Sequence, residues 1–163
     1  MIDLDNFSIK DIIVIDCEAS GLDEESYPIE VGVALHDDSF GFLIKPEKDW
    51  NYWSKEAEGI HKIKREELFA EGISCYEAAQ ILNSQLRGLT LFSDATDFEM
   101  FWLNRLFKAA QCEMLFEIDS IYSLPFDVDI YMTEKKKLSS YIITHRAEND
   151  AHIIRESLVK SLP

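Results

Sequence analysis

Two acidic residues follow an unbroken apolar run near the start of the sequence. Residues 12–15 are three isoleucines and a valine, a composition typical of a β-strand buried on both faces, and Asp16 and Glu18 come directly after this run. Because strand side chains alternate with a period of two, both carboxylates project from the same face. Like charges so placed repel each other unless a cation lies between them, so this stretch predicts a cation site.

Titratable side chains also gather in two later segments. One segment follows an apolar run at residues 89–92, and the other opens the last helical segment. Together they hold Asp94, Asp97, Glu99, His145 and Asp150. In open α/β sheets, functional side chains collect where strand ends meet helix starts. A cluster of oxygen ligands suits Mg²⁺ or Mn²⁺ rather than zinc, which prefers His and Cys.

Such a cluster has the residue types needed for phosphodiester hydrolysis. Two divalent ions about 4 Å apart can activate a water molecule and stabilise the leaving oxygen of an in-line displacement. A histidine that gains and loses a proton near neutral pH is suited to act as the general base toward that water. The sequence holds a candidate in His145.

The strand signals predict a mixed sheet. Residues 27–35 and 40–44 indicate two strands that follow the first through short polar turns, which gives a three-stranded antiparallel meander. A fourth strand is predicted at 89–92 and a fifth at 113–118, whereas 119–137 is expected to be partly helical. The expected fold class is α/β, with a mixed five-stranded sheet flanked by helices.

Helix signals lie between and after the strands. Ser54 is expected to cap a short helix and Ser74 a longer one, in which Glu77 completes a capping box. A third helix is expected to end at Ala110. The inner faces of the longer helix and the last helix are predicted to hold Ala78, Ile81, Leu82 and Leu86, and Ala151, Ile154, Leu158 and Leu162, respectively.

The composition is typical of one globular domain. The chain has 163 residues, of which 47% are hydrophobic, and no linker or repeat divides it, so residues 1–163 are expected to form a single domain. No apolar run approaches the roughly 18 residues of a membrane span, and residues 1–10 hold no basic cluster. We therefore expect a cytoplasmic protein without a signal peptide or a membrane partner.

The formal net charge of -15 restricts the possible nucleic-acid ligands. Phosphate backbones repel acidic surfaces, so the charge argues against tight binding of long duplexes. It is compatible with a protein that engages a few nucleotides at a strand end, where bound metal ions supply positive charge. Simple solubility, or a basic protein partner, would explain the same charge.

The cysteines indicate neither disulfides nor a zinc site. Cys17, Cys75 and Cys112 are widely spaced and form no C-x-x-C pair. We expect three buried thiols, with Cys17 facing away from Asp16 and Glu18.

Taken together, these motifs resemble the DEDDh exonucleases, a DnaQ-like superfamily with a ribonuclease H-like fold. Residues 15–22, I-D-C-E-A-S-G-L, resemble the first motif, and residues 29–32, I-E-V-G, resemble its second strand. Residues 59–63, G-I-H-K-I, are similar to the family's H-G-I stretch, with Lys62 in place of glycine. The third motif, H-x-x-x-x-D, is the most specific match and spans residues 145–150.

The resemblance implies a function and roles for individual residues. It implies a 3′-5′ exonuclease that uses two Mg²⁺ or Mn²⁺ ions on single-stranded RNA or DNA ends, which the acidic surface restricts to short substrates. Asp16, Glu18 and Asp150 would bind the metal ions, and His145 would be the general base. An alternative is a catalytically weak or inactive interaction module that keeps the exonuclease fold.

The second motif departs from the family pattern. The family places a metal-binding Asp where this sequence has Glu99, between Phe98 and Trp102. A glutamate is one methylene longer and could still reach a metal ion, although its positioning would change. Asp94 is the alternative ligand, and Asp97 is either a third candidate or the N-cap of the following helix.

The resemblance also indicates substrate contacts. Ala19, Ser20 and Leu22 would line the terminal nucleotide, and His61 would approach the same pocket. The aromatic residues of 50–53 would either stack on bases or anchor their own loop. The three lysines of 135–137 would either guide a strand or form a solvated face.

Overall fold

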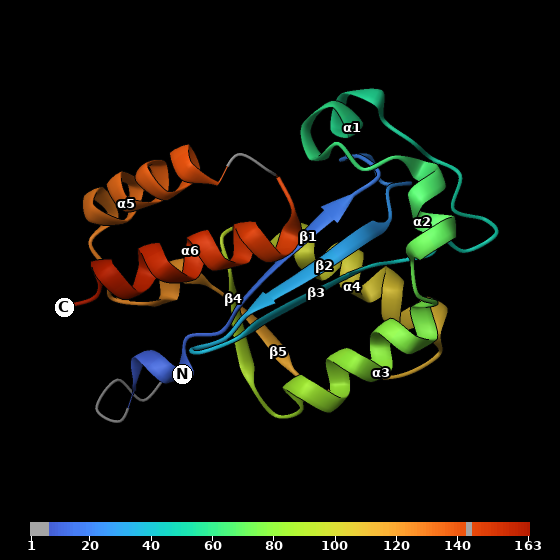
Figure 1. Cartoon of the computed structure of the whole chain (residues 1–163). Coiled ribbons are helices and arrows are strands. Elements are labelled where there is room, and N and C mark those ends of the chain that lie inside the picture. The colour runs from blue at the N-terminus through green and yellow to red at the C-terminus, as the bar shows by residue number, and fades with distance from the viewer. Residues whose placement is uncertain (1–6, 143–144) are drawn as a thin grey trace.

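A five-stranded mixed sheet forms the centre of the computed structural model, which describes residues 7–142 and 145–163 (Figure 1). The strands are β1 (Val14–Ala19), β2 (Pro28–Ala34), β3 (Ser39–Leu43), β4 (Thr90–Ser93) and β5 (Glu117–Ser120). They lie in the order β3-β2-β1-β4-β5. Strands β1, β2 and β3 pair antiparallel, whereas β4 pairs parallel with both β1 and β5. The predicted mixed sheet is therefore confirmed.

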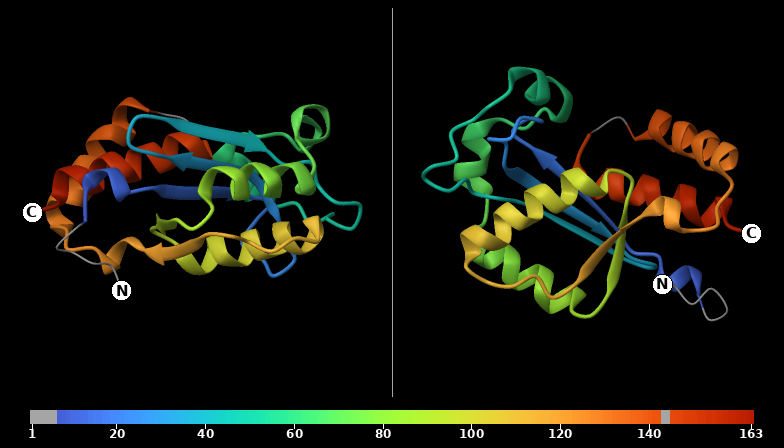
Figure 2. Two further views of the ribbon diagram at one scale, coloured as in Figure 1. Left: turned by 90° about the horizontal axis from the view of Figure 1, so that it is seen from below. Right: turned by 180° about the vertical axis from the view of Figure 1, so that it is seen from behind.

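Helices cover both faces of this sheet. The described helices are α1 (Lys55–His61), α2 (Arg65–Glu71), α3 (Cys75–Leu86), α4 (Thr96–Ala110), α5 (Val128–Tyr141) and α6 (Ala147–Ser161), with short 3-10 helices at Ile9–Asp11 and Ile121–Ser123. Helix α6 lies on one face with α5 beside it, and α3 and α4 lie on the other (Figure 2). None of the described helices is both long enough and apolar enough to cross a membrane.

The alternation of side chains along β1 separates two hydrophobic cores. Ile15 and Cys17 belong to the larger core with α3 and α4, whereas Val14 belongs to the smaller core with α5 and α6. By the same alternation, Asp16 and Glu18 belong to the α6 side of the strand. Cys17 is buried and faces away from both acids, as predicted.

The first turn of α6 approaches β2 and β3 closely. A Cβ atom added at Gly32 would lie 2.1 Å from the Glu148 nitrogen and 2.2 Å from the Ala147 carbonyl carbon. At Gly41 an added Cβ would lie 3.1 Å from the Glu148 Cβ. Two glycines thus provide the space that lets the start of α6 lie against the sheet.

The predicted fifth strand is confirmed, but its bounds of 113–118 were wrong, because β5 is Glu117–Ser120. Asn83 of α3 explains the difference. Its side-chain amide donates a hydrogen bond to the Glu113 carbonyl at 2.8 Å, and its side-chain oxygen accepts one from the Leu115 nitrogen at 2.9 Å. These backbone groups are bonded to a side chain and do not join the sheet.

Region 119–137 is partly helical, as expected, because α5 begins there. Asp127 caps this helix, and its side chain accepts a hydrogen bond from the Ile130 nitrogen at 2.9 Å. Large apolar residues, including Ile130 and Met132, lie on the exposed surface of α5. They obscure the pattern by which an amphipathic helix is recognised. The last helix begins at Ala147, so His145 precedes it instead of lying in its first turn.

Three predicted core side chains are not buried. Ile81 is exposed because α3 turns Ala79 toward the core instead, whereas Ala78, Leu82 and Leu86 are buried as predicted. Leu162 follows the end of α6 and is only half-buried. Cys112 is half-buried in the turn after α4, whereas Cys75 is buried as predicted.

We predict that Gly32→Ala destabilises the protein by about 1–3 kcal/mol, because the added methyl group overlaps the backbone of α6. Gly59→Ala is the matched control, since nothing lies within 4 Å of a Cβ at this helical position. There the substitution should stabilise the protein by about 0.5–1 kcal/mol. Urea denaturation measures both effects. A Gly32→Ala protein as stable as wild type would contradict the close approach of α6.

Candidate active site

Three carboxylates converge at the end of β1. Asp16 and Glu18 extend from β1 and Asp150 from the first turn of α6, and one oxygen of each lies within 4.8 Å of the others. The expectation that the two strand acids share one face is confirmed. Oxygen atoms this close together are the donor set of a hard divalent cation.

Burial and mutual repulsion raise the pKa values of these three acids. Burial, and after it the charges of Glu99 and Glu18, raises the pKa of Asp16 well above its usual value. Burial and then the charge of Asp150 raise the pKa of Glu18 to about 8. Burial also raises the pKa of Asp150, although the nearby His145 partly opposes this effect. Without a cation, Glu18 therefore retains its proton at neutral pH.

Glu99 lies on the border of this cluster. It belongs to the first turn of α4, is only 2% exposed, and accepts a hydrogen bond from the Ser93 hydroxyl at 2.5 Å. Burial raises the pKa of Glu99 to about 7, even though the Ser93 hydrogen bond acts in the opposite direction. Among the charged neighbours that raise the pKa of Asp16, Glu99 has the largest effect.

The other two acids of this segment are placed differently. Asp94 forms an ion pair with Lys135 of α5, with 2.7 Å between Oδ2 and Nζ. Asp97 is exposed, and the prediction that it caps α4 was wrong because Ala95 occupies the N-cap position. The Ala95 nitrogen donates a hydrogen bond to the Ser93 hydroxyl at 2.9 Å, so a serine of β4 shapes the start of this helix.

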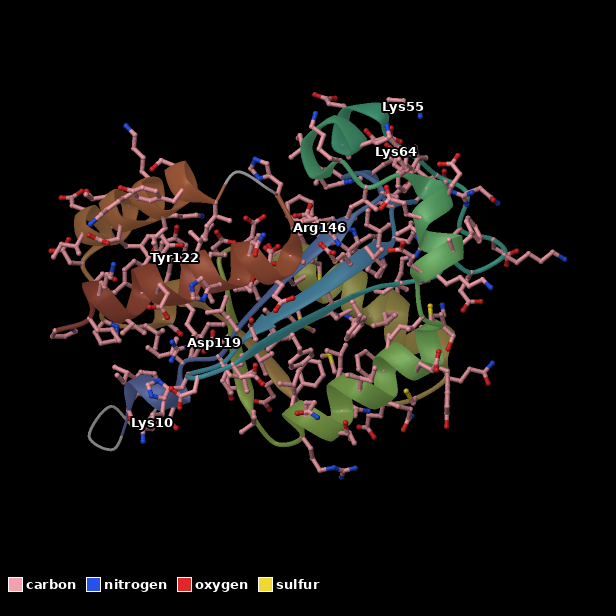
Figure 3. The ribbon with its side chains drawn as sticks, in the orientation of Figure 1. Lys10, Lys55, Lys64, Asp119, Tyr122 and Arg146 are labelled. Carbon is pink, nitrogen blue, oxygen red and sulfur yellow. The ribbon has the colours of Figure 1, made fainter. Side chains whose placement is uncertain are left out.

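His145 lies at the edge of the carboxylate cluster, and the two residues that follow it are hydrogen-bonded to Glu30 of β2. Its Nδ1 lies 4.0 Å from Asp150 Oδ2, and its side chain is 63% exposed. The next residue, Arg146, donates from Nε to both oxygens of Glu30, at 3.1 and 2.8 Å. The Ala147 nitrogen donates to the same carboxylate at 2.8 Å. Figure 3 shows Arg146 at the start of α6, beside the ends of β1 and β2.

A cavity of about 520 Å³ opens at the end of β1. Ala19, Leu22 and His61, three of the residues predicted to hold a terminal nucleotide, line this cavity. Ser20 does not, because it is fully buried and its hydroxyl accepts a hydrogen bond from the Tyr27 nitrogen at 3.1 Å. Ser20 thus stabilises the turn that shapes the cavity.

The aromatic residues of the 50–53 loop divide between core and cavity. Trp50 is buried and stacks on Tyr27 with ring centroids 5.3 Å apart, whereas Tyr52 lines the cavity. Trp53 donates a hydrogen bond to Glu58 and so anchors its loop. Trp102 of α4 also lines the cavity, although its sequence pattern indicated only an apolar helix position. The signal in the sequence that could have identified Trp102 as a cavity residue is its place one helical turn after Glu99.

Comparisons with known proteins identify the fold. The sequence matches no known protein family and no curated protein. The structure is similar to Escherichia coli exonuclease I in complex with a dA16 oligonucleotide, with a TM-score of 0.69 and 15% identity. The alignment covers 91% of this chain and 40% of that chain. This chain therefore shares the fold of exonuclease I, and the predicted ribonuclease H-like fold is confirmed.

Other exonuclease I structures give the same result. The moderately thermophilic exonuclease I from Methylocaldum szegediense aligns with a TM-score of 0.67 and 14% identity, over 91% of this chain and 40% of that chain. The zinc-bound complex of the E. coli enzyme with single-stranded DNA aligns with a TM-score of 0.68 and 14% identity over the same shares. This chain therefore spans less than half of the length of these longer proteins.

The side chains of the carboxylate cluster fit a divalent ion. Asp16, Glu18 and Asp150 offer only carboxylate oxygens, and their raised pKa values show that the protein places negative charge where it is poorly tolerated without a cation. These three residues would hold the ion.

We predict that the metal-free protein loses stability as the pH rises. The pKa of Glu18 is raised from 4.5 to about 8 on folding, so the folded state binds more protons than the unfolded state between these values. Stability in EDTA should therefore fall between about pH 5 and pH 8, as followed by thermal unfolding. At about pH 8, Mn²⁺ at 100 times its Kd should restore about 2.7 kcal/mol.

The matched control for this experiment is Asp16→Asn, which keeps the side-chain volume and removes one ligand. Its unfolding temperature should respond much less to Mn²⁺ than that of wild type. An equal response in both proteins would show that the ion binds elsewhere.

Proposed function

We propose that this chain is a metal-dependent 3′-5′ exonuclease that acts on the ends of single-stranded RNA or DNA. The observation that carries the proposal is the group of three carboxylates within 4.8 Å, next to His145 and a cavity of about 520 Å³. Exonuclease I, which has the same fold, was crystallised with single-stranded oligonucleotides. The net charge of -15 favours short substrates.

In the proposed reaction, Asp16, Glu18 and Asp150 would hold two Mg²⁺ or Mn²⁺ ions. Such ions, when bound, supply Lewis-acid stabilisation of the phosphoryl oxygens and acidify a water molecule. His145 accepts the proton of the attacking water, since its ring is exposed and can turn toward the cluster. Asp150, 4.0 Å away, stabilises the imidazolium that results.

We assign the remaining metal ligand of the family pattern to Glu99. Its carboxylate is buried, and its charge acts directly on Asp16. Asp94 is paired with Lys135, and Asp97 is exposed to solvent.

The cavity would hold the terminal nucleoside. Its volume lies within the usual range of small-molecule sites, and the side chains of Tyr52 and Trp102 offer aromatic surface for a base. Ala19 and Leu22 provide apolar contacts, and His61 contributes a largely buried imidazole. Burial lowers the pKa of His61, so this ring is expected to bind as the neutral form.

We expect the purified protein with Mn²⁺ to shorten 5′-labelled RNA or DNA oligonucleotides stepwise from the 3′ end. Asp16→Asn should abolish cleavage because a metal ligand is lost. His145→Ala should reduce kcat by about 100-fold to 10,000-fold, the usual contribution of a general base, while metal binding persists. Gel electrophoresis of the products and calorimetric titration with Mn²⁺ measure the two effects.

Intact oligonucleotides after incubation with folded, metal-bound protein would contradict the proposal. A second candidate function, an inactive interaction module, is favoured by the Glu99 substitution and the net charge. Under that alternative the same titration need not show binding of two ions.

The remaining ligand, the fourth after Asp16, Glu18 and Asp150, can be assigned with isosteric variants. Glu99→Gln keeps the side-chain volume and the contact with Ser93 but should lower kcat by about 100-fold or more. Asp94→Asn, which loses only the ion pair with Lys135, should lower kcat by less than about tenfold. The reverse order of effects would assign the ligand to Asp94.

A further inference from the structure

Lys135 brings a positive charge to the edge of the acidic cluster. Its ammonium group contacts Asp94 Oδ2 at 2.7 Å and lies 5.8 Å from the centre of the Tyr131 ring. The side chain remains 34% exposed, so the ammonium is accessible from solvent. An ammonium has three donors, and the Asp94 contact leaves donors for a further ligand.

Lys135 also lines a second hollow, which lies on α5. This hollow has a volume of about 430 Å³ and is lined by Met132, Thr133, Lys135, Lys136 and Ser139. Lys136 is exposed and forms no ion pair within the described part of the chain. By contrast, Lys64 and Lys160 are each bound to a glutamate. The hollow therefore combines the exposed charge of Lys136 and the ammonium group of Lys135, which is paired with Asp94, with the apolar side chain of Met132.

The two hollows belong to helices that lie on different sides of the start of α6. The nucleoside-sized cavity is lined by residues of α1, whereas the lysine-lined hollow belongs to α5. Figures 1 and 2 show α1 and α5 on opposite sides of the start of α6, which carries Asp150. If the cluster acts on the phosphate that joins the last two nucleotides, the rest of the strand must leave on the side opposite the terminal nucleoside.

We propose that the nucleic-acid strand leaves the active site across α5, where Lys135 and Lys136 bind the phosphates upstream of the cleaved bond. This inference rests on the proposed function for the direction of the strand. Its ligand class is a single-stranded polynucleotide, recognised through its phosphates and without regard to base. A protein with a net charge of -15 repels a phosphate backbone over most of its surface. The two lysines supply positive charge at the place where the phosphates would bind.

The test measures binding of a 5′-fluorescein-labelled oligothymidylate of about eight nucleotides, with phosphorothioate linkages that resist hydrolysis. Fluorescence anisotropy in Mn²⁺ gives the Kd at several salt concentrations. Lys136→Glu should raise the Kd about tenfold and reduce the salt slope by about 0.7 for the lost phosphate contact. Lys135→Met should weaken binding as well, and Lys135→Arg, which keeps the charge, should restore it.

The matched control is Lys108→Glu, an exposed lysine in the last turn of α4, which makes the same change in net charge away from α5. Its Kd should stay within about twofold of wild type. Equal Kd values for Lys136→Glu and Lys108→Glu, or no binding by wild type, would overturn the inference.

Hydrolysis of thymidine 5′-(4-nitrophenyl phosphate) by the same preparations reports separately on the proposed function. Hydrolysis by wild type without an affinity loss in Lys136→Glu overturns only the path across α5. An affinity loss without any hydrolysis supports the binding of a strand by these lysines on α5 and contradicts the exonuclease.

Discussion

The contact between the start of α6 and β2 is the interaction on which the candidate site depends. The Glu30 carboxylate accepts hydrogen bonds from both Arg146 and the Ala147 nitrogen, and Gly32 leaves room for the helix backbone. A buried carboxylate satisfied by a guanidinium and a backbone amide is a strong, directional anchor. Because Asp150 follows within one turn, this anchor determines where the last acid of the cluster meets those of β1.

The acidic cluster illustrates how a folded core can impose an unfavourable local arrangement. Val14 and Ile15 are fully buried, and strand pairing holds the following residues in place, so Asp16 and Glu18 cannot move apart. The resulting repulsion and desolvation appear as raised pKa values. A site that must attract a divalent cation benefits from this arrangement, since the cation relieves the same repulsion. The same repulsion lowers the stability of the metal-free protein.

Sequence patterns predicted those features that depend on neighbours along the chain. The shared face of Asp16 and Glu18 follows from strand alternation, and the mixed sheet follows from the order of apolar runs. The features that were missed depend on distant side chains. Asn83 shifts the start of β5 because its side chain forms hydrogen bonds with backbone groups about 30 residues later in the chain. Trp102 reaches the cavity only through the packing of α4. Ser20 matches a family motif, yet its hydroxyl is used to hold a turn.

The topology of the sheet has a consequence for the order of folding. Strands β1, β2 and β3 form a local meander, whereas the pairing of β1 with β4 joins segments more than 70 residues apart along the chain. Contacts between distant segments close large loops and therefore tend to form after local ones. We expect the acids of β1, α4 and α6 to remain apart in early folding intermediates and to meet only in the last steps. Charge repulsion would then oppose the completion of folding without hindering its nucleation.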